Sequence, residues 1–169
     1  MTETGTKLDQ AWFRKVLGHF PTGVVIVTAM SGDAPTGLAI GSFLSVSLEP
    51  RLVAVLPAKT STSWPRIAAA DSFCVNVLHV EQQDLCRRFA VSGGDKFAGV
   101  RWRPAPSGAP ILDGALAWID CDHERSVDAG DHLMVLGRVR SLEVDAGQVP
   151  APLIFFQGRY GTFAGGAEL

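Results

Sequence analysis

A lysine followed by four hydroxyl side chains is the most chemically suggestive run in the chain. The run is Lys59-Thr60-Ser61-Thr62-Ser63, and it follows a wholly apolar stretch, Leu52–Leu56. Lysine acts as a point charge, and hydroxyl and backbone N–H groups donate hydrogen bonds, so this composition suits a phosphate. A solvated loop with an incidental helix cap is the alternative interpretation of the same residues.

Small residues precede this run at positions where a flat ring could lie close to the backbone. They are Gly37, Ala39, Gly41 and Ser42. A surface for a ring followed by a site for a phosphate predicts a nucleotide-like cofactor, and we favour a flavin. Neither GxGxxG after a strand nor GxxxxGK[ST] occurs in the chain, so we expect neither Rossmann nor P-loop binding.

Histidine chemistry centres on His132, in the turn Gly130-Asp131-His132. At the tip of a predicted hairpin its imidazole can reach a ligand, although a surface turn histidine is the plainer interpretation. Cys121 and His123 share one face of a strand, but a metal site needs more ligands than these two. We therefore predict no metal site.

Composition indicates one compact domain. The chain has 169 residues, of which 47% are apolar and 19% charged. We expect a tail at 1–8, a single domain at 9–164 and a second tail at 165–169. A domain near this size buries roughly 70% of its unfolded surface, and the apolar excess predicts a surface for a partner subunit.

Charge and cysteine content indicate which partners and which compartment to expect. The net charge is -2 without a basic block, so we expect no nucleic-acid partner. The three cysteines are odd in number and show no CxxC spacing, which favours a reducing compartment. No run approaches the ~20 apolar residues of a membrane span, so we expect no membrane partner and a cytoplasmic location.

The elements that must position these residues are mainly strands. A helix over Gln10–His19 is predicted to turn Trp12, Phe13, Val16, Leu17 and Phe20 toward a core. Two more short helices are expected, one capped by Ser63 and one over Val80–Phe89. Predicted strands lie at Val24–Thr28, Phe43–Ser47, Leu52–Leu56, Phe73–Leu78, Leu116–Cys121, Leu133–Val144 and Leu153–Phe156. Direct strand-turn-strand links favour a mainly β fold, an antiparallel barrel with a few helices.

Seven segments in this order resemble the flavin reductase family of FMN-binding split barrels. The resemblance is to the small reductase component of two-component flavin-dependent monooxygenases, especially those hydroxylating phenols and steroid-derived aromatic rings. It covers about Trp12 to Phe163. The matching segments are Phe20–Val24, Gly37–Ser47, Lys59–Trp64, Phe73–Leu78, Asp95–Gly99, Gly130–His132 and Gly158–Gly161. Many relatives carry Thr and Asn where this chain has Ala39 and Gly41, so backbone groups would make most flavin contacts there.

The resemblance implies roles for individual residues. His132 would be the catalytic residue, facing the nicotinamide. The isoalloxazine would be lined by Ala39, Ile40, Gly41 and Ser42, with Ser45 nearby. The phosphate end would be held by Lys59, Thr60, Ser61 and Ser63. The border of the site would be formed by Phe89, Lys96, Phe97, Arg159 and Tyr160.

The resemblance also implies an activity and partners. It predicts an NAD(P)H:flavin oxidoreductase, a split β-barrel homodimer with flavin sites at the subunit interface. FMN or FAD would take hydride from NADH or NADPH, and the reduced flavin would diffuse to an oxygenase component. Two alternatives stay open: a flavin-binding carrier or sensor without turnover, and a split-barrel oxidase acting on a phosphorylated pyridoxine-type substrate.

Overall fold

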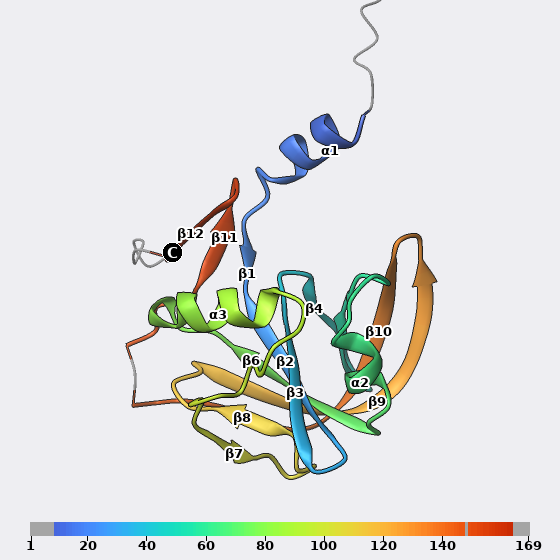
Figure 1. Cartoon of the computed structure of the whole chain (residues 1–169), viewed down its shortest axis with the longest axis vertical. Coiled ribbons are helices and arrows are strands. Elements are labelled where there is room, and N and C mark those ends of the chain that lie inside the picture. Colours follow the sequence, from blue (N-terminus) through green and yellow to red (C-terminus); the bar gives the residue numbers. More distant parts are fainter. Residues whose placement is uncertain (1–8, 148, 164–169) are drawn as a thin grey trace, which may run out of the picture.

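A seven-stranded antiparallel sheet forms the body of the protein (Figure 1). The computed structural model describes residues 9–147 and 149–163, so the predicted tails at 1–8 and 165–169 lie outside the described residues. The strand order is β3-β2-β6-β9-β10-β5-β4, and every pairing is antiparallel. The strands are β2 Val25–Ser31, β3 Ala34–Ile40, β4 Phe43–Leu48, β5 Arg51–Val55, β6 Ser72–Val77, β9 Ala117–Ala129 and β10 His132–Val144.

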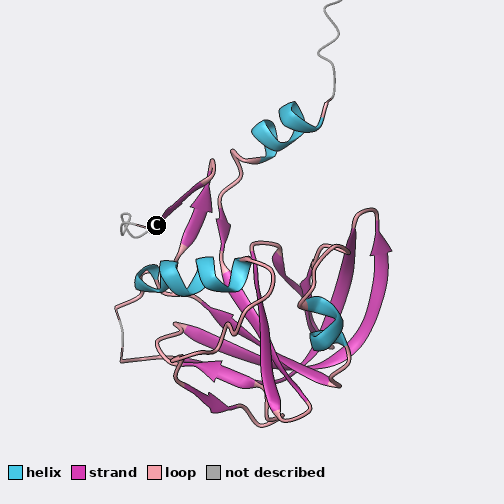
Figure 2. Ribbon diagram, in the orientation of Figure 1, coloured by secondary structure: helices cyan, strands magenta, loops and turns pink. Residues whose placement is uncertain are grey.

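Two smaller sheets and three short helices complete the described fold (Figure 2). One small sheet has the order β1-β11-β12 and the other pairs β7 with β8. Their strands are β1 Thr22–Gly23, β11 Ile154–Phe156, β12 Arg159–Gly161, β7 Trp102–Pro104 and β8 Pro110–Leu112. The helices are α1 Gln10–Leu17, α2 Trp64–Ala68 and α3 Gln83–Ala90, and the 3₁₀ turn η1 Val80–Gln82 precedes α3. The predicted class, mainly β and antiparallel with short helices, is confirmed, and the open strand order is compatible with a split barrel.

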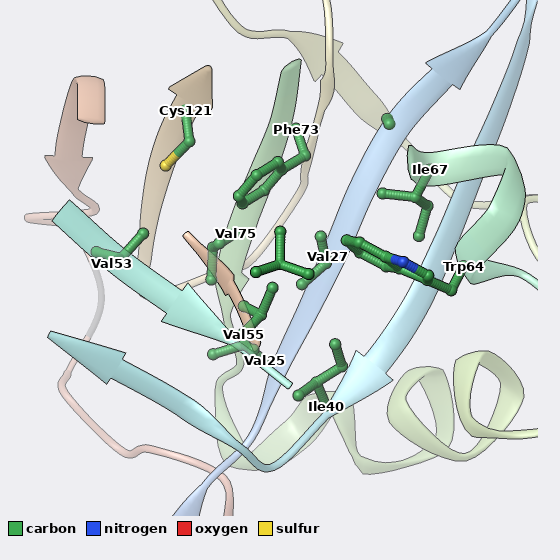
Figure 3. Close-up of a cluster of buried hydrophobic side chains, with 12 residues drawn as sticks. Val25, Val27, Ile40, Val53, Val55, Trp64, Ile67, Phe73, Val75 and Cys121 are labelled. Carbon is green, nitrogen blue, oxygen red and sulfur yellow. The ribbon is translucent and has the colours of Figure 1, made fainter. Parts of the chain in front are cut away.

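The main core lies between the strands of the large sheet and α2 (Figure 3). β-branched side chains from five strands meet there because such residues pack well on a pleated surface. The cluster comprises Val25, Val27, Ala29, Ile40, Val53, Val55, Trp64, Ile67, Phe73, Val75, Cys121 and Val135. Among its members, Trp64 and Ile67 anchor α2 and thereby fix the end of the hydroxyl-rich loop.

A second core attaches α3 to the sheet through Phe89, which is fully buried. Its ring packs against Gly37 in β3 so closely that a Cβ added at Gly37 would lie 2.5 Å from Phe89 Cε1. Phe97 meets Phe89 edge-on, with ring centroids 5.0 Å apart. The absence of a side chain at Gly37 therefore sets the distance between α3 and β3.

The predicted orientation of the first helix is wrong. No side chain of α1 is buried, and Phe13 and Leu17 are 53% and 54% exposed. α1 stands away from the sheet in Figure 1, beyond the small sheet of β1, β11 and β12. Asp9 caps the start of the helix, since its Oδ1 accepts a hydrogen bond from Trp12 N at 2.8 Å. Amphipathic spacing predicted the helix correctly, but it does not specify which surface covers the apolar face.

Three cysteines, Cys74, Cys86 and Cys121, are free thiols and all are buried. Burial raises the pKa of Cys74 and Cys86, and it raises that of Cys121 to about 12. The neighbouring carboxylate of Asp120 adds to the effect at Cys74 and Cys121. All three groups are therefore neutral thiols at neutral pH.

Replacing Gly37 by alanine is expected to lower the free energy of unfolding by about 1–3 kcal/mol, because the new methyl group must displace the buried Phe89 ring. Urea denaturation followed by fluorescence measures this change. Gly23→Ala in β1 is the matched control, since nothing lies within 4 Å of a Cβ there. Equal losses in the two variants would contradict the close packing.

Candidate functional site

A cleft of about 340 Å³ opens where four segments of different origin meet. The segments are the end of β3 with the residues after it, the loop that follows β5, the end of α3, and the start of β10. The lining residues are Leu38, Ala39, Ile40, Gly41, Ser42, Leu56, Pro57, Ala58, Thr60, Ser61, Thr62, Ser63, Ala90, Val91, Ser92, Lys96 and His132. One end of this cleft is bordered by small residues and the other by hydroxyl side chains.

The small-residue run is a strand for most of its length, which the sequence did not predict. β3 runs from Ala34 to Ile40 and pairs with β2 in regular register. Gly41 follows it, where a Cβ would lie 3.2 Å from Thr22 Oγ1. The edge of the sheet thus presents backbone, with little side-chain bulk, along one wall of the cleft.

The hydroxyl-rich loop is shaped by its own hydrogen bonds. Ser61 N donates to Ala58 O at 3.0 Å, and Ser61 Oγ accepts from Trp64 N at 3.1 Å. Ser61 therefore caps the start of α2, whereas Ser63, the predicted cap, makes no capping hydrogen bond. In the described structure the hydroxyls of Thr60 and Thr62 make no side-chain hydrogen bond, which leaves them available at the cleft.

Lys96 joins three elements at the centre of the site. Its Nζ donates to Ser63 Oγ at 2.9 Å, to Phe89 O at 3.0 Å and to Gly37 O at 3.4 Å. The ammonium group has three donors, and each has an acceptor in this arrangement. The side chain therefore connects the loop, the end of α3 and β3, while itself bordering the cleft.

The charge on Lys96 has no carboxylate partner among residues 9–147 and 149–163. Lys96 is only 9% exposed, and burial lowers the pKa of its ammonium below the ordinary value. Its neighbour Asp95 instead accepts from Phe97 N at 3.0 Å. A buried cation that is bonded only to neutral acceptors is not neutralised, so it attracts an anionic ligand. The residues thus fit a phosphorylated flavin.

His132 enters the cleft at the first position of β10. Its Nδ1 lies 2.7 Å from Asp131 Oδ1, and this hydrogen bond lowers the pKa of the Asp131 carboxyl. The turn is attached to the loop by Lys59 N donating to Asp131 O at 2.9 Å and Leu133 N donating to Pro57 O at 3.0 Å. With Nδ1 occupied, Nε2 is the ring nitrogen left for a ligand.

A larger chamber of about 700 Å³ adjoins the cleft at Lys96. Thr62, Ser63 and Lys96 border both spaces. The remaining walls of the chamber are Ala34, Pro35, Thr36, Gly37, Arg66, Gly93, Gly94, Asp95, Phe97 and Trp102.

A smaller apolar pocket of about 180 Å³ adjoins the cleft and shares Ala39, Ile40, Gly41 and Ala90 with it. Tyr160 of β12 lines it, and its hydroxyl lies 3.4 Å from Cys86 Sγ. Burial, together with this contact, raises the pKa of Tyr160 to about 12. The phenol is therefore protonated at neutral pH.

Most of the site residues predicted from the sequence converge. Those lining the cleft or its two extensions are Ala39, Ile40, Gly41, Ser42, Thr60, Ser61, Ser63, Lys96, Phe97, His132 and Tyr160. Four others do not line these spaces. Lys59 forms an ion pair with Asp128, Phe89 is buried beneath β3, and Ser45 and Arg159 are exposed. Their predicted contacts with a flavin remain predictions.

The residues predicted for the site did not include Ala90–Ser92 or Arg66, although the long connection Val91–Pro110 was expected to shape a site. Ala90–Ser92 closes the cleft from the end of α3. The adjoining run Ser92-Gly93-Gly94-Asp95 belongs to this long connection, and a long ordered connection in a small domain often shapes a site. Arg66, one turn past the hydroxyl run, gave no such signal.

The described residues contain no group of three or more His, Cys, Asp and Glu side chains placed to hold a metal ion. No helix in the described part of the chain is long and apolar enough to cross a bilayer.

Comparison with known proteins gives concordant results. A "Flavin reductase" of Pseudomonas putida is 51% identical over 158 residues, covering 93% of this chain and 92% of the relative. The "Flavin-dependent monooxygenase, reductase subunit HsaB" of Mycobacterium tuberculosis is 46% identical, covering 91% of this chain and 82% of the relative. A solved structure of the Streptomyces globisporus NADH:FAD oxidoreductase SgcE6, in complex with NAD and FAD fragments, superposes with a TM-score of 0.86. It is 37% identical, and the match covers 95% of this chain and 96% of that one.

A match of this chain to a protein family agrees with these relatives. The flavin reductase like domain matches residues 17–164, which include every segment that lines the cleft. The resemblance read from the seven segments is therefore confirmed, and this chain belongs to the family of flavin reductase like domains.

Proposed function

We propose that this chain is an NAD(P)H-dependent flavin reductase that supplies reduced FMN or FAD to a separate monooxygenase. The observation that carries the proposal is the cleft in which a buried, carboxylate-free Lys96 lies between a small-residue strand and a hydroxyl-rich loop. Similarity to a monooxygenase reductase subunit and to an NADH:FAD oxidoreductase supports the same activity and cofactors.

The protein's part in this reaction is binding and orientation. A bound flavin supplies a ring that accepts hydride from a reduced nicotinamide and passes electrons onward. Backbone of Ala39–Ser42 would border that ring, and Thr60, Ser61 and Ser63 would hold its phosphate beside Lys96. His132, fixed through Nδ1 by Asp131, would orient the nicotinamide with Nε2.

The open cleft also suits a flavin that leaves after reduction. Thr60 and Thr62 offer unengaged hydroxyls, but Lys96 already makes three hydrogen bonds within the protein. Its attraction for a phosphate would therefore be mainly that of a nearby charge, which favours moderate flavin affinity. A carrier or sensor could use the same cleft, so turnover is the distinguishing observation.

Turnover and the role of His132 can be tested together. Mixing the protein with NADH and free FMN should consume NADH, followed at the nicotinamide absorbance band, whereas a carrier would leave it unchanged. We expect His132→Ala to raise the KM for NADH about tenfold or more, because the carboxamide loses its partner, with FMN Kd changed less than twofold.

His123→Ala is the matched control, because His123 bonds Ser126 on β9 and does not line the cleft. An unchanged KM for NADH in His132→Ala would remove the proposed role of His132. Absence of NADH consumption by the unsubstituted protein, at saturating FMN, would remove the proposed activity.

The charge on Lys96 predicts a pH-dependent preference for phosphorylated flavin. Burial lowers the pKa of Lys96, so its positive charge is lost at a lower pH than that of a free lysine, whose pKa is about 10.4. The ratio of riboflavin Kd to FMN Kd should therefore fall as pH rises from 7 toward that range. Quenching of flavin fluorescence measures both constants, and the shared ring makes riboflavin an internal control.

Two lysine variants separate the candidate phosphate partners. Lys59→Met removes an exposed lysine paired with Asp128 and should change the ratio of riboflavin Kd to FMN Kd by less than twofold. Lys96→Met should abolish the preference, with thermal unfolding recorded to verify the fold. A ratio that is independent of pH, or one that depends on Lys59 alone, would contradict the assignment to Lys96.

We also propose that the protein is a homodimer, because two apolar surfaces have no cover within the described chain. One is the apolar face of α1 and the other is edge strand β4, where Leu48 is 85% exposed. Sedimentation equilibrium should give twice the monomer mass, and Phe13→Asp on α1 should shift the population toward monomer. Arg14→Asp is the control, and a monomeric unsubstituted protein would contradict the proposal.

A further inference from the structure

A separate cavity of about 430 Å³ opens between the β7–β8 sheet, the start of β9 and the end of β10. It shares no lining residue with the cleft, the larger chamber or the small apolar pocket. The β7–β8 sheet lies at the lower edge of Figure 1, whereas α1 lies at the top. The volume is within the range of small-molecule sites, roughly 300–1,000 Å³. Flavin reduction in the cleft gives this cavity no role.

The polar atom that draws attention to the cavity is the indole N–H of Trp118. The side chain is 8% exposed and packs in an apolar cluster, yet its N–H donates no hydrogen bond within the described chain. No fully buried side-chain nitrogen or oxygen of the described residues lacks a partner, so solvent reaches this nitrogen. A largely buried tryptophan usually finds an acceptor. Because Trp118 lines the cavity, a ligand there can supply one.

A second donor lies beside this N–H. The Arg103 guanidinium sits over the Trp118 ring, 5.6 Å from its centroid, and lines the same cavity. Arg103 is exposed and has no carboxylate partner among residues 9–147 and 149–163. The planar fork of an arginine matches a carboxylate. The two side chains together therefore favour a ligand that carries a carboxylate.

A carboxylate of the protein faces the same space. Glu143 in β10 is paired directly with Trp118 in β9, and residues paired in this way lie on one face of a sheet. Glu143 is exposed, lines the cavity, and forms no ion pair with Arg103 or with any other cation of the described chain. Its charge is therefore available for a cationic group.

The remaining walls complete the chemistry of the cavity. Ile111, Leu112 and Ala115 are buried and provide an apolar surface. The other two lining carboxylates are engaged, because Asp113 pairs with Arg101 and Asp145 accepts from Gly147 N at 2.9 Å. Arg103 and Glu143 thus remain as an unpaired cation and an unpaired anion beside an apolar wall.

We propose that this cavity is a second small-molecule site, which binds a zwitterion with an apolar side group, an α-amino acid being the simplest. Its carboxylate would accept from Arg103 and the Trp118 N–H, and its ammonium group would donate to Glu143. A simple anion would leave Glu143 unpaired, and a simple cation would leave Arg103 and the indole N–H unpaired. The site is independent of the proposed function, so either can fail without the other.

L-Phenylalanine is the probe, because analogues that lack one of its charges are available. In a ¹H–¹⁵N spectrum its addition should shift the indole signal of Trp118, assigned by comparison with Trp118→Phe, and not that of Trp12. A Kd of about 1 mM is expected for a ligand of this size. 3-Phenylpropionate lacks the ammonium group and 2-phenylethylamine lacks the carboxylate, so each should bind about fivefold more weakly or worse.

Two exposed positions allow variants that leave the core intact. Arg103→Gln and Glu143→Gln should each raise the Kd of L-phenylalanine about fivefold, since each removes one charge contact. Arg103→Gln should not weaken 2-phenylethylamine further, and Glu143→Gln should not weaken 3-phenylpropionate further. Arg125→Gln and Glu49→Gln are the matched controls, because both residues are exposed and line none of the cavities described above.

Three results would overturn the proposal. The first is an unshifted Trp118 signal with L-phenylalanine present at about twenty times the expected Kd. The second is an affinity for 3-phenylpropionate or 2-phenylethylamine equal to that for L-phenylalanine, since the site would then read a single charge. The third is an L-phenylalanine Kd that neither Arg103→Gln nor Glu143→Gln changes relative to the two controls.

Discussion

A buried ammonium group bonded only to neutral oxygens is the interaction on which the site depends. Lys96 Nζ connects Ser63 in the loop, Gly37 in β3 and Phe89 at the end of α3. Three elements from distant parts of the sequence are thus held by one side chain, and its positive charge is left at the point where the cleft meets the larger chamber. Because the charge has no carboxylate partner in the described structure, the same group can position the walls and attract an anion.

The sheet supplies the rest of the geometry. β5 pairs with both β4 and β10, so the loop after β5 lies beside the turn between β9 and β10. Hydrogen bonds from Lys59 N and Leu133 N join that loop to the turn, which places His132 opposite the small-residue edge of β3. None of these contacts is local in sequence, and the order β9-β10-β5-β4 brings them together.

Local patterns predicted much of this arrangement, and tertiary packing decided the remainder. The hairpin with His132 at its tip followed from turn residues between two apolar runs, and the hydroxyl loop followed from composition. Strand β3 was not predicted because Gly37, Ala39 and Gly41 lack the β-branched side chains typical of strands. Gly37 is nevertheless required there, because the Phe89 ring leaves no room for a side chain. Lys59 lies among hydroxyls in sequence, yet its side chain pairs with Asp128, while Lys96 reaches the loop from 33 residues away. Helix α1 is a further example, since the spacing of its apolar residues predicts an apolar face but not the surface that packs against it.

The burial of the three thiols affects how readily the protein is oxidised in the presence of dioxygen. Dihydroflavin released into oxygenated solution reacts with dioxygen and yields peroxide, and the thiolate is the form of cysteine that peroxide attacks. Cys74, Cys86 and Cys121 are shielded by packing and held in the protonated state. The fold therefore withholds its most oxidisable atoms from the by-product that its own chemistry would generate.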